Sequence, residues 1–169
     1  MSDLWPGLNG PAIRYISEAP SEAWRRGVRQ LVLLGSTGSI GGNTLAAIRS
    51  RRRECVVLGL SCARNIKTLA EQAQEFRPPY LAVLDEASAA GLRKLLPTGY
   101  TPEILVGSEG YARLAALPEA DTVLSAQVGA AGLAGTLAAA LAGKVICLAN
   151  KESLVLAGDM PVSYTHLRA

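Results

Sequence analysis

The sequence predicts an α/β fold, a doubly wound parallel sheet with helices on both faces. After residue 29, short apolar runs rich in β-formers alternate with helical stretches, which is typical of right-handed strand–helix–strand units. The first strong strand leads directly into a glycine-rich turn that opens a helix. Of the 169 residues, 49% are apolar and 18% are charged, as in globular proteins with a single core.

Six strands are expected, because each apolar run is too short for a helix and several are apolar throughout. They are residues 31–34, 55–60, 80–84, 104–106, 122–124 and 144–148. Apolar residues recur with helical spacing between 66 and 76, and leucines recur at every fourth position from 133 to 141. Asn65 and Ser108 are expected to cap the helices that they precede. Gly143 is expected to end the last helix.

The glycine turn has the spacing GxxGxxG, formed by Gly35, Gly38 and Gly41. Gly35 permits a sharp turn, Gly38 lets the backbone approach a pyrophosphate, and Gly41 lets the helix pack closely on the strand. The helix N-terminus offers free N–H groups to the phosphates, and Thr37 and Ser39 add hydroxyl donors. We therefore predict a dinucleotide site in a Rossmann-type domain; the alternative is a turn that serves packing alone. The face of this helix expected to pack on the sheet contains Ile40, Thr44, Leu45 and Ile48.

The end of the second strand distinguishes between the two nicotinamide dinucleotides. Sites that prefer NAD place an Asp or Glu there to bind the ribose 2′-hydroxyl, but no acid occurs between Cys55 and Ala70. Arg64 and Asn65 follow this strand, and a guanidinium pairs bidentately with a 2′-phosphate. This favours NADP; the alternative is that Arg64 is a solvated residue at the start of a helix.

A polar cluster of Asn150, Lys151 and Glu152 follows the last strand. In an open parallel sheet these side chains face the same crevice as the glycine turn. Lys151 suits an anionic substrate, Asn150 suits a ribose, and Glu152 can orient either. The alternative is a helix N-terminus with Asn150 as its cap and Glu152 matching the dipole, and the residues alone leave both open. The small residues at 128–132 either lie beside the cofactor or form a tight turn.

Charge and cysteine content argue against several functions. The net charge of +3 comes from scattered arginines, so no nucleic-acid partner is expected. No apolar run reaches the ~18–20 residues that span a bilayer, so no membrane partner is expected. The three cysteines and the single histidine lack the spacing of a metal site. Cys55 and Cys147 are expected to be buried, whereas Cys62 lies at a strand end where access is possible.

Residues 1–28 are expected to be a mobile extension or a misassigned start. They lack the apolar centre of a secretion signal, and their three acidic residues argue against an organelle transit peptide. A cytoplasmic location is therefore expected.

Three segments resemble one family in their order and spacing: GSTGSIG at 35–41, AQVGAAGL at 126–133 and LANKESLVLAG at 148–158. They are similar to the N-terminal NADPH-binding domain of 1-deoxy-D-xylulose 5-phosphate reductoisomerase, from about Val28 to Gly158. The resemblance implies an NADPH-dependent oxidoreductase of non-mevalonate isoprenoid biosynthesis. It converts a sugar phosphate, 1-deoxy-D-xylulose 5-phosphate, to 2-C-methyl-D-erythritol 4-phosphate, uses a magnesium or manganese ion, and forms a homodimer.

The resemblance also implies roles for individual residues. Lys151 matches a lysine that contacts the substrate, which favours the first of its two interpretations. Arg64 matches a position that is often basic, although Ala63 replaces a glycine that is common there. The residues that match NADPH-binding positions are Thr37, Gly38, Ser39, Ile40, Asn65, Asn150 and Glu152.

The resemblance finally predicts how the chain is divided. Residues 29–158 form the NADP-binding domain, and residues 159–169 are a foreign tail that looks like translated adapter sequence, so His166 is given no role. The catalytic domain and its metal ligands are not expected in this chain, which is therefore expected to be inactive alone. Two alternatives are another NADP-dependent dehydrogenase, such as a semialdehyde dehydrogenase, and a non-catalytic dinucleotide sensor.

Overall fold

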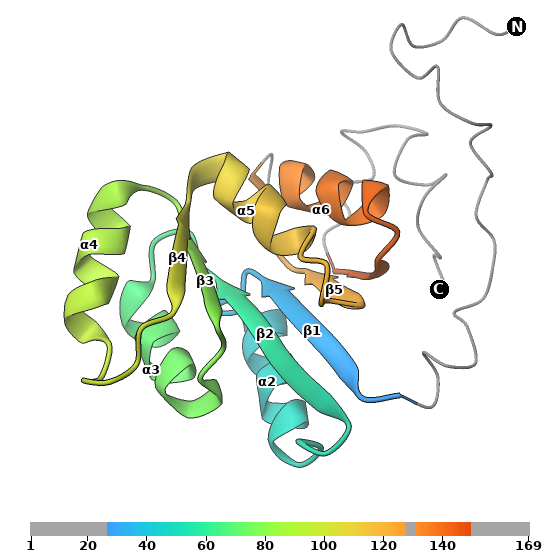
Figure 1. Ribbon diagram of the computed structural model, residues 1–169, viewed down its shortest axis with the longest axis horizontal. Coiled ribbons are helices and arrows are strands. Elements are labelled where there is room, and N and C mark those ends of the chain that lie inside the picture. The colour runs from blue at the N-terminus through green and yellow to red at the C-terminus, as the bar shows by residue number, and fades with distance from the viewer. Residues whose placement is uncertain (1–26, 128–130, 150–169) are drawn as a thin grey trace, which may run out of the picture.

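The computed structural model describes residues 27–127 and 131–149. These residues form a six-stranded parallel sheet flanked by five helices (Figure 1). The strands are β1 (Arg29–Leu34), β2 (Cys55–Ser61), β3 (Tyr80–Val83), β4 (Glu103–Val106), β5 (Thr122–Ser125) and β6 (Val145–Leu148). The helices are α2 (Ser39–Arg49), α3 (Ile66–Phe76), α4 (Glu86–Leu95), α5 (Gly107–Ala115) and α6 (Ala131–Leu141). None of the helices in this part of the chain has the length and apolar content needed to cross a bilayer.

The strand order is β4-β3-β2-β1-β5-β6, and every pair of neighbours is parallel. The chain passes outward from β1 to β4 and then returns to place β5 on the other side of β1. The direction of winding therefore reverses between β1 and β5, which is the switch point where open α/β sheets bind ligands. The predicted doubly wound fold is confirmed, and each predicted strand lies within two residues of an observed one.

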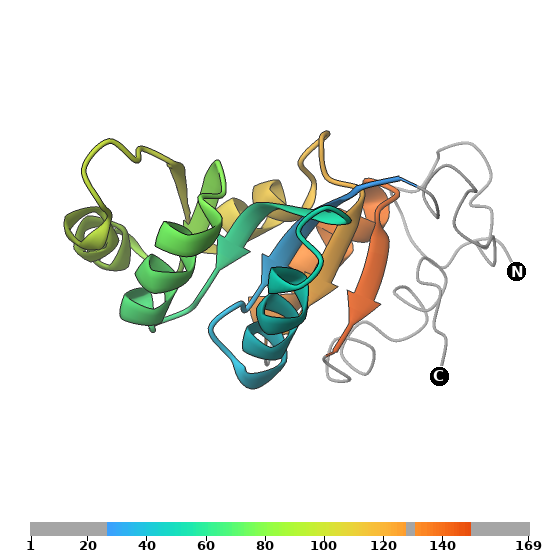
Figure 2. The ribbon, with the colours of Figure 1, turned by 90° about the horizontal axis from the view of Figure 1, so that it is seen from below.

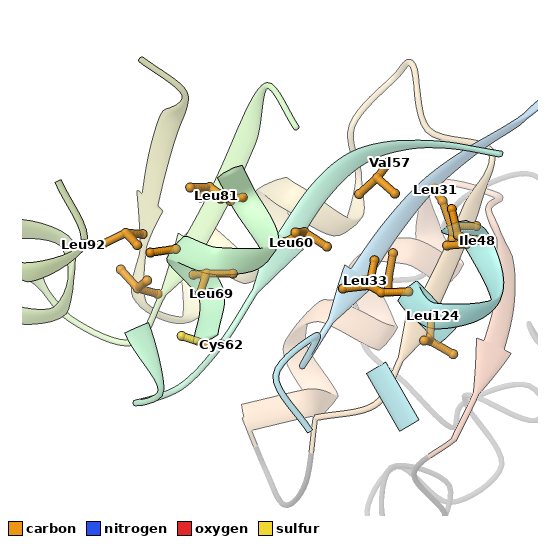
Figure 3. Close-up of a cluster of buried hydrophobic side chains, with 14 of the residues drawn as sticks. Leu31, Leu33, Ile48, Val57, Leu60, Cys62, Leu69, Leu81, Leu92 and Leu124 are labelled. Atoms are coloured by element: carbon orange, nitrogen blue, oxygen red, sulfur yellow. The ribbon is translucent and has the colours of Figure 1, made fainter. Parts of the chain in front are cut away.

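Two apolar layers hold the helices against the sheet, because successive strand residues point to opposite faces. Leu31 and Leu33 of β1 belong to one buried cluster, and Val32 and Leu34 belong to the other. Helices α2, α3 and α4 cover the first face, and α5 and α6 cover the second (Figure 2). Figure 3 shows the first cluster, in which leucines of the central strands meet side chains of the covering helices.

Two of the three predicted helix ends are confirmed. The Asn65 side chain accepts a hydrogen bond from the Thr68 N–H at 3.2 Å, as an N-cap does. Gly143 has a φ of +68° and donates to the Ala140 carbonyl, while Lys144 donates to the Ala139 carbonyl, both at 3.0 Å. These two bonds form a Schellman motif.

The prediction that Ser108 caps α5 is wrong. Helix α5 begins at Gly107, directly after β4, and Val106 occupies the capping position without a side-chain hydrogen bond. Gly107 has a φ of +72°, so the chain turns from strand to helix within one residue. Ser108 consequently lies inside the helix.

The predicted burial of the cysteines is also partly wrong. Cys62 is fully buried, whereas Cys147 is exposed and Cys55 is half-buried. Cys62 directly follows the central strand β2, where its backbone N–H bonds to Ala82 and its carbonyl accepts from the Tyr111 hydroxyl at 2.8 Å. Cys147 lies on β6, which ends the strand order of the described sheet.

Candidate dinucleotide-binding site

The glycine turn joins the carboxyl end of β1 to α2 at the switch point of the sheet (Figure 1). Gly35 has a φ of +82°, and a Cβ there would lie 2.8 Å from the carbonyl oxygen of Ala126, just after β5. A Cβ on Gly41 would lie 2.5 Å from the carbonyl oxygen of Gly35. The turn, the loop after β5 and the start of α2 are therefore in direct backbone contact, and both positions require glycine for packing.

Gly38 has different surroundings from the other two glycines. Its φ of −80° and ψ of 174° are open to any residue, and a Cβ would meet only the Gly35 carbonyl oxygen, at an ordinary 3.5 Å. Gly38 is exposed. Packing within the described chain thus gives no reason for a glycine here, whereas close approach of a phosphate to the backbone does.

The N-terminus of α2 is open for an anion. Gly38 caps it without a side-chain hydrogen bond, and the first turn contains no acidic residue. The N–H groups of Ser39 and Ile40, both exposed, have no acceptor within the helix because they belong to its first turn. They carry the positive end of the helix dipole, which favours phosphate.

Ile40 does not pack on the sheet, contrary to the prediction for this helix. Its side chain is 47% exposed, whereas Gly41, Leu45 and Ile48 are buried. Gly41 faces the turn, and Ile40 points away from it because consecutive helical residues are about 100° apart. The open helix end therefore carries an exposed apolar side chain beside free N–H groups.

A buried polar network fixes the turn from behind. Ser36 is fully buried, and its N–H donates to the Ser61 carbonyl at 2.8 Å. The Ser61 hydroxyl accepts from the Gly35 N–H at 3.0 Å, and the Gln72 amide contacts Ser36 at two points. None of these three residues, Ser36, Ser61 and Gln72, was predicted from the sequence. Gln72 was recognisable as a polar residue within the apolar stripe of residues 66–76.

The end of β2 brings Arg64 and Asn65 to the same edge of the sheet as the glycine turn, because β1 and β2 are parallel neighbours. Both side chains are exposed. The Oδ1 atom of Asn65 caps α3, and the amide N–H groups of the same side chain take no part in that hydrogen bond. The pKa of the Asp85 carboxyl is lowered, mainly by the hydrogen bond that it accepts from the Ser88 N–H and to a smaller extent by the positive charge of Arg64.

The remaining predicted positions, Asn150, Lys151, Glu152 and residues 128–130, lie outside the described residues. Strand β6 leads toward the polar cluster, and the Ala149 N–H donates to the Ser125 carbonyl at 2.9 Å. The chain therefore leaves β6 at the edge that holds the glycine turn. Within residues 27–127 and 131–149, no three His, Cys, Asp or Glu side chains are grouped to hold a metal ion.

A pocket of about 460 Å³ lies between α4 and β4, with Arg93, Tyr100 and Ile104 among its lining residues. It precedes β4 in the chain and therefore lies at the amino edge of the sheet, opposite the glycine turn. None of the predicted site residues lines it.

Comparison with known proteins identifies the family. The family model described as 1-deoxy-D-xylulose 5-phosphate reductoisomerase matches residues 31–158. The chain belongs to this family. It is 60% identical over 149 residues to the reductoisomerase of Nitratidesulfovibrio vulgaris strain DP4, which covers 88% of this chain and 36% of the relative. For the Lawsonia intracellularis reductoisomerase the identity is 54% over 147 residues, 86% of this chain and 37% of the relative. The chain spans about a third of the length of these curated relatives.

Solved structures of reductoisomerases share the fold. One, described as a complex with magnesium, is 43% identical and superposes with a TM-score of 0.77 over 81% of this chain and 34% of that chain. The Zymomonas mobilis reductoisomerase in complex with NADPH is 37% identical, with a TM-score of 0.74 over 79% of this chain and 35% of that chain. The predictions of fold and family are thereby confirmed.

Proposed function

We propose that this chain supplies the NADPH-binding domain of 1-deoxy-D-xylulose 5-phosphate reductoisomerase. The whole enzyme converts 1-deoxy-D-xylulose 5-phosphate to 2-C-methyl-D-erythritol 4-phosphate. One observation carries the proposal: the helix that follows the glycine turn at the switch point of the sheet has no side-chain hydrogen bond at its N-cap and no acidic residue in its first turn. Family membership and the NADPH complex of the Zymomonas mobilis relative support the choice of cofactor.

In this proposal the cofactor pyrophosphate lies over Gly38 and accepts hydrogen bonds from the N–H groups of Ser39 and Ile40. The hydroxyls of Thr37 and Ser39 are further donors. Arg64 pairs with the 2′-phosphate of the adenosine ribose, and the amide N–H groups of Asn65 bind beside it. NADPH supplies the hydride for the reduction, and these residues bind and orient it.

The other roles follow from the resemblance. Asn150 and Glu152 contact NADPH, and Lys151 contacts the anionic sugar phosphate. The catalytic residues and the ligands of a magnesium or manganese ion lie outside this chain, so the chain alone binds NADPH without turnover. The whole enzyme is a cytoplasmic homodimer without a nucleic-acid or membrane partner.

The semialdehyde dehydrogenase alternative requires a reactive cysteine near the cofactor. Cys62 is the cysteine that follows β2, beside the proposed site, but it is fully buried and burial raises the pKa of its thiol to about 11. A thiol in this state is protonated and inert at neutral pH. Cys62 is therefore not suited to be the nucleophile of a cysteine-dependent dehydrogenase.

Calorimetric titration with NADPH and NADH tests the cofactor choice. We expect the chain to bind NADPH at least about tenfold more tightly, because a hydrogen bond to a charged group contributes ~1.5–3 kcal/mol. Arg64→Gln removes most of this preference by weakening NADPH and leaving NADH unchanged. Arg53→Gln is the matched control, an exposed arginine in the turn before β2, at the opposite edge of the sheet. Equal affinities of the unaltered chain for the two cofactors would contradict the role of Arg64.

A further inference from the structure

Gln72 is a polar residue on the buried face of α3. The helix packs Leu69, Ala70 and Ala73 toward the sheet, and Gln72 lies among them with only 8% of its surface exposed. An amphipathic helix places apolar residues at such positions, because a buried amide is unfavourable unless it is hydrogen-bonded. The partners of Gln72 therefore have to account for its presence.

Both polar atoms of the Gln72 side chain contact one residue, Ser36. The Nε2 atom donates to the Ser36 carbonyl at 2.9 Å, and the Ser36 hydroxyl donates to Oε1 at 2.7 Å. The Ser36 N–H donates to the Ser61 carbonyl on β2. The Ser36 hydroxyl also lies 3.1 Å from the Ser61 carbonyl oxygen. Every polar group of Ser36 is thus bonded to α3 or β2, and Ser36 itself is fully buried.

Ser36 lies between the two parts of the glycine turn. Before it, Gly35 makes the sharp turn; after it, residues 37–40 are partly or fully exposed at the start of α2. The first turn of α2 packs directly on Ser36, because a Cβ on Gly41 would lie 2.6 Å from the Ser36 Cα. A fixed orientation matters for binding, because groups already held in place lose little entropy when the ligand arrives.

We infer that Gln72 is a positioning residue for the phosphate-binding turn: through Ser36 it holds residues 37–40 in the conformation that presents the α2 N-terminus to the cofactor pyrophosphate. Gln72 itself does not touch the ligand. The inference rests on the proposed function, because it assigns to Gln72 a part in the same dinucleotide site.

The chemistry of the contact explains why the residue is glutamine. Ser36 offers Gln72 one acceptor, its carbonyl, and one donor, its hydroxyl. An amide side chain has both the N–H donor and the oxygen acceptor needed to form a hydrogen bond with each. Methionine has a similar shape but neither group. Glutamate keeps the acceptor but would place a carboxylate oxygen about 3 Å from the Ser36 carbonyl oxygen in place of the Nε2 donor, and its charge would oppose a nearby phosphate.

The test compares Gln72→Met and Gln72→Glu with Gln74→Met, an exposed glutamine on the same helix that serves as the matched control. Each variant is titrated with NADPH and with 2′-AMP, which carries the adenosine 2′-phosphate but no pyrophosphate. We expect Gln72→Met to weaken NADPH about tenfold and Gln72→Glu to weaken it further. The tenfold loss corresponds to ~1.4 kcal/mol. Binding of 2′-AMP stays within about twofold of the unaltered chain in every variant, because its phosphate is bound by Arg64 and Asn65 and not by the turn.

Unchanged NADPH affinity in Gln72→Met would overturn the inference, as would an equal loss for both ligands, which indicates general damage to the domain. Backbone hydrogen exchange without cofactor gives an independent measurement: the hydrogen-bonded amides of the turn, those of Ser36, Gly38 and Gly42, exchange faster in Gln72→Met and not in Gln74→Met. If Gln72→Met does not fold, Ser36→Ala removes the hydroxyl contacts with Gln72 and Ser61 and keeps the bond from Gln72 Nε2 to the carbonyl of residue 36, so we expect the same effects to a smaller degree. A chain that binds no NADPH contradicts the proposed function, while the exchange measurement still tests the positioning.

Discussion

Gly38 and Gly41 lie three residues apart in one turn, yet an added methyl group meets different surroundings at each. At Gly41 it would lie 2.5 Å from a backbone oxygen, and at Gly38 its nearest neighbour is 3.5 Å away. We expect Gly41→Ala to lower the free energy of unfolding by about 1–3 kcal/mol, as overpacking does. Gly38→Ala lowers it by less than about 1 kcal/mol, the difference between these residues at a helix N-cap.

The same pair separates ligand binding from packing. We expect Gly38→Ala to weaken NADPH binding at least about tenfold, because its methyl group would occupy the space proposed for the pyrophosphate. Denaturant unfolding and calorimetry measure the two effects. A Gly38→Ala variant that binds NADPH as tightly as the unaltered chain would show that this glycine does not face the cofactor.

Cys62 makes the stability of the domain depend on pH in the alkaline range. Burial raises the pKa of its thiol from the ordinary 9.0 to about 11. Below pH 9 the thiol is protonated in both the folded and the unfolded chain, so it has no differential effect. Between about pH 9 and 11 the thiol ionises only in the unfolded chain, which lowers the free energy of unfolding by roughly 2 kcal/mol.

We expect unfolding titrations of Cys62→Ala to show a flatter decline across this range than those of the unaltered chain. Burial also raises the pKa of Tyr111 from the ordinary 10.0, with a smaller contribution from Cys62, so the two proteins are best compared between pH 9 and 10, before tyrosine ionises in the unfolded chain. Identical pH dependence in the two proteins would mean that Cys62 is not held neutral by the fold.

At the scale of single elements, the end of α6 gives a clean test of backbone conformation. Gly143 has a φ of +68°, and a Cβ there would meet nothing within 4 Å. Gly143→Ala therefore acts through the left-handed backbone alone, and we expect it to lower the free energy of unfolding by about 1 kcal/mol. Gly143→Asn should cost less, because asparagine tolerates this conformation. Thermal unfolding compares them, and an unaffected Gly143→Ala would contradict the Schellman end.

The elements that sequence could predict are those whose signal is local. The apolar runs, the glycine turn and the Asn65 cap each depend on neighbours within a few residues, and all were found where expected. Helix α6 was predicted from its leucines, but Gly135 and Ala139 form part of its buried face while Leu141 is 64% exposed. Small residues are needed there because a Cβ on Gly135 would lie 2.6 Å from Leu34, a contact between distant segments.

In the candidate site, too, the local features could be predicted from the sequence and the contacts between distant segments could not. The glycine spacing predicted where the turn lies, but the network of Ser36, Ser61 and Gln72 spans 36 residues in sequence between its first and last members. Its existence depends on β2 and α3 packing beside the turn. The exposure of Ile40 likewise depends on which residue of α2 faces the turn, and hydrophobicity alone assigned it to the wrong side.

At the scale of the whole molecule, the fold brings the proposed cofactor groups to one edge of the sheet. The turn after β1, the residues after β2 and the chain leaving β6 share this edge because all six described strands are parallel. The pocket beside Tyr100 lies at the opposite edge. We therefore expect NADPH to bind at the carboxyl end of the strands and not at the edge that holds this pocket.

The most direct test is a backbone amide NMR spectrum of the chain recorded as NADPH is added. We expect the largest shifts at Gly38, Ser39 and Ile40, with further changes at Arg64 and Asn65. Amides around Tyr100 stay in place and serve as the internal control. Largest shifts around Tyr100, or no shifts in the glycine turn at saturating NADPH, would contradict the assignment of this turn as the dinucleotide site.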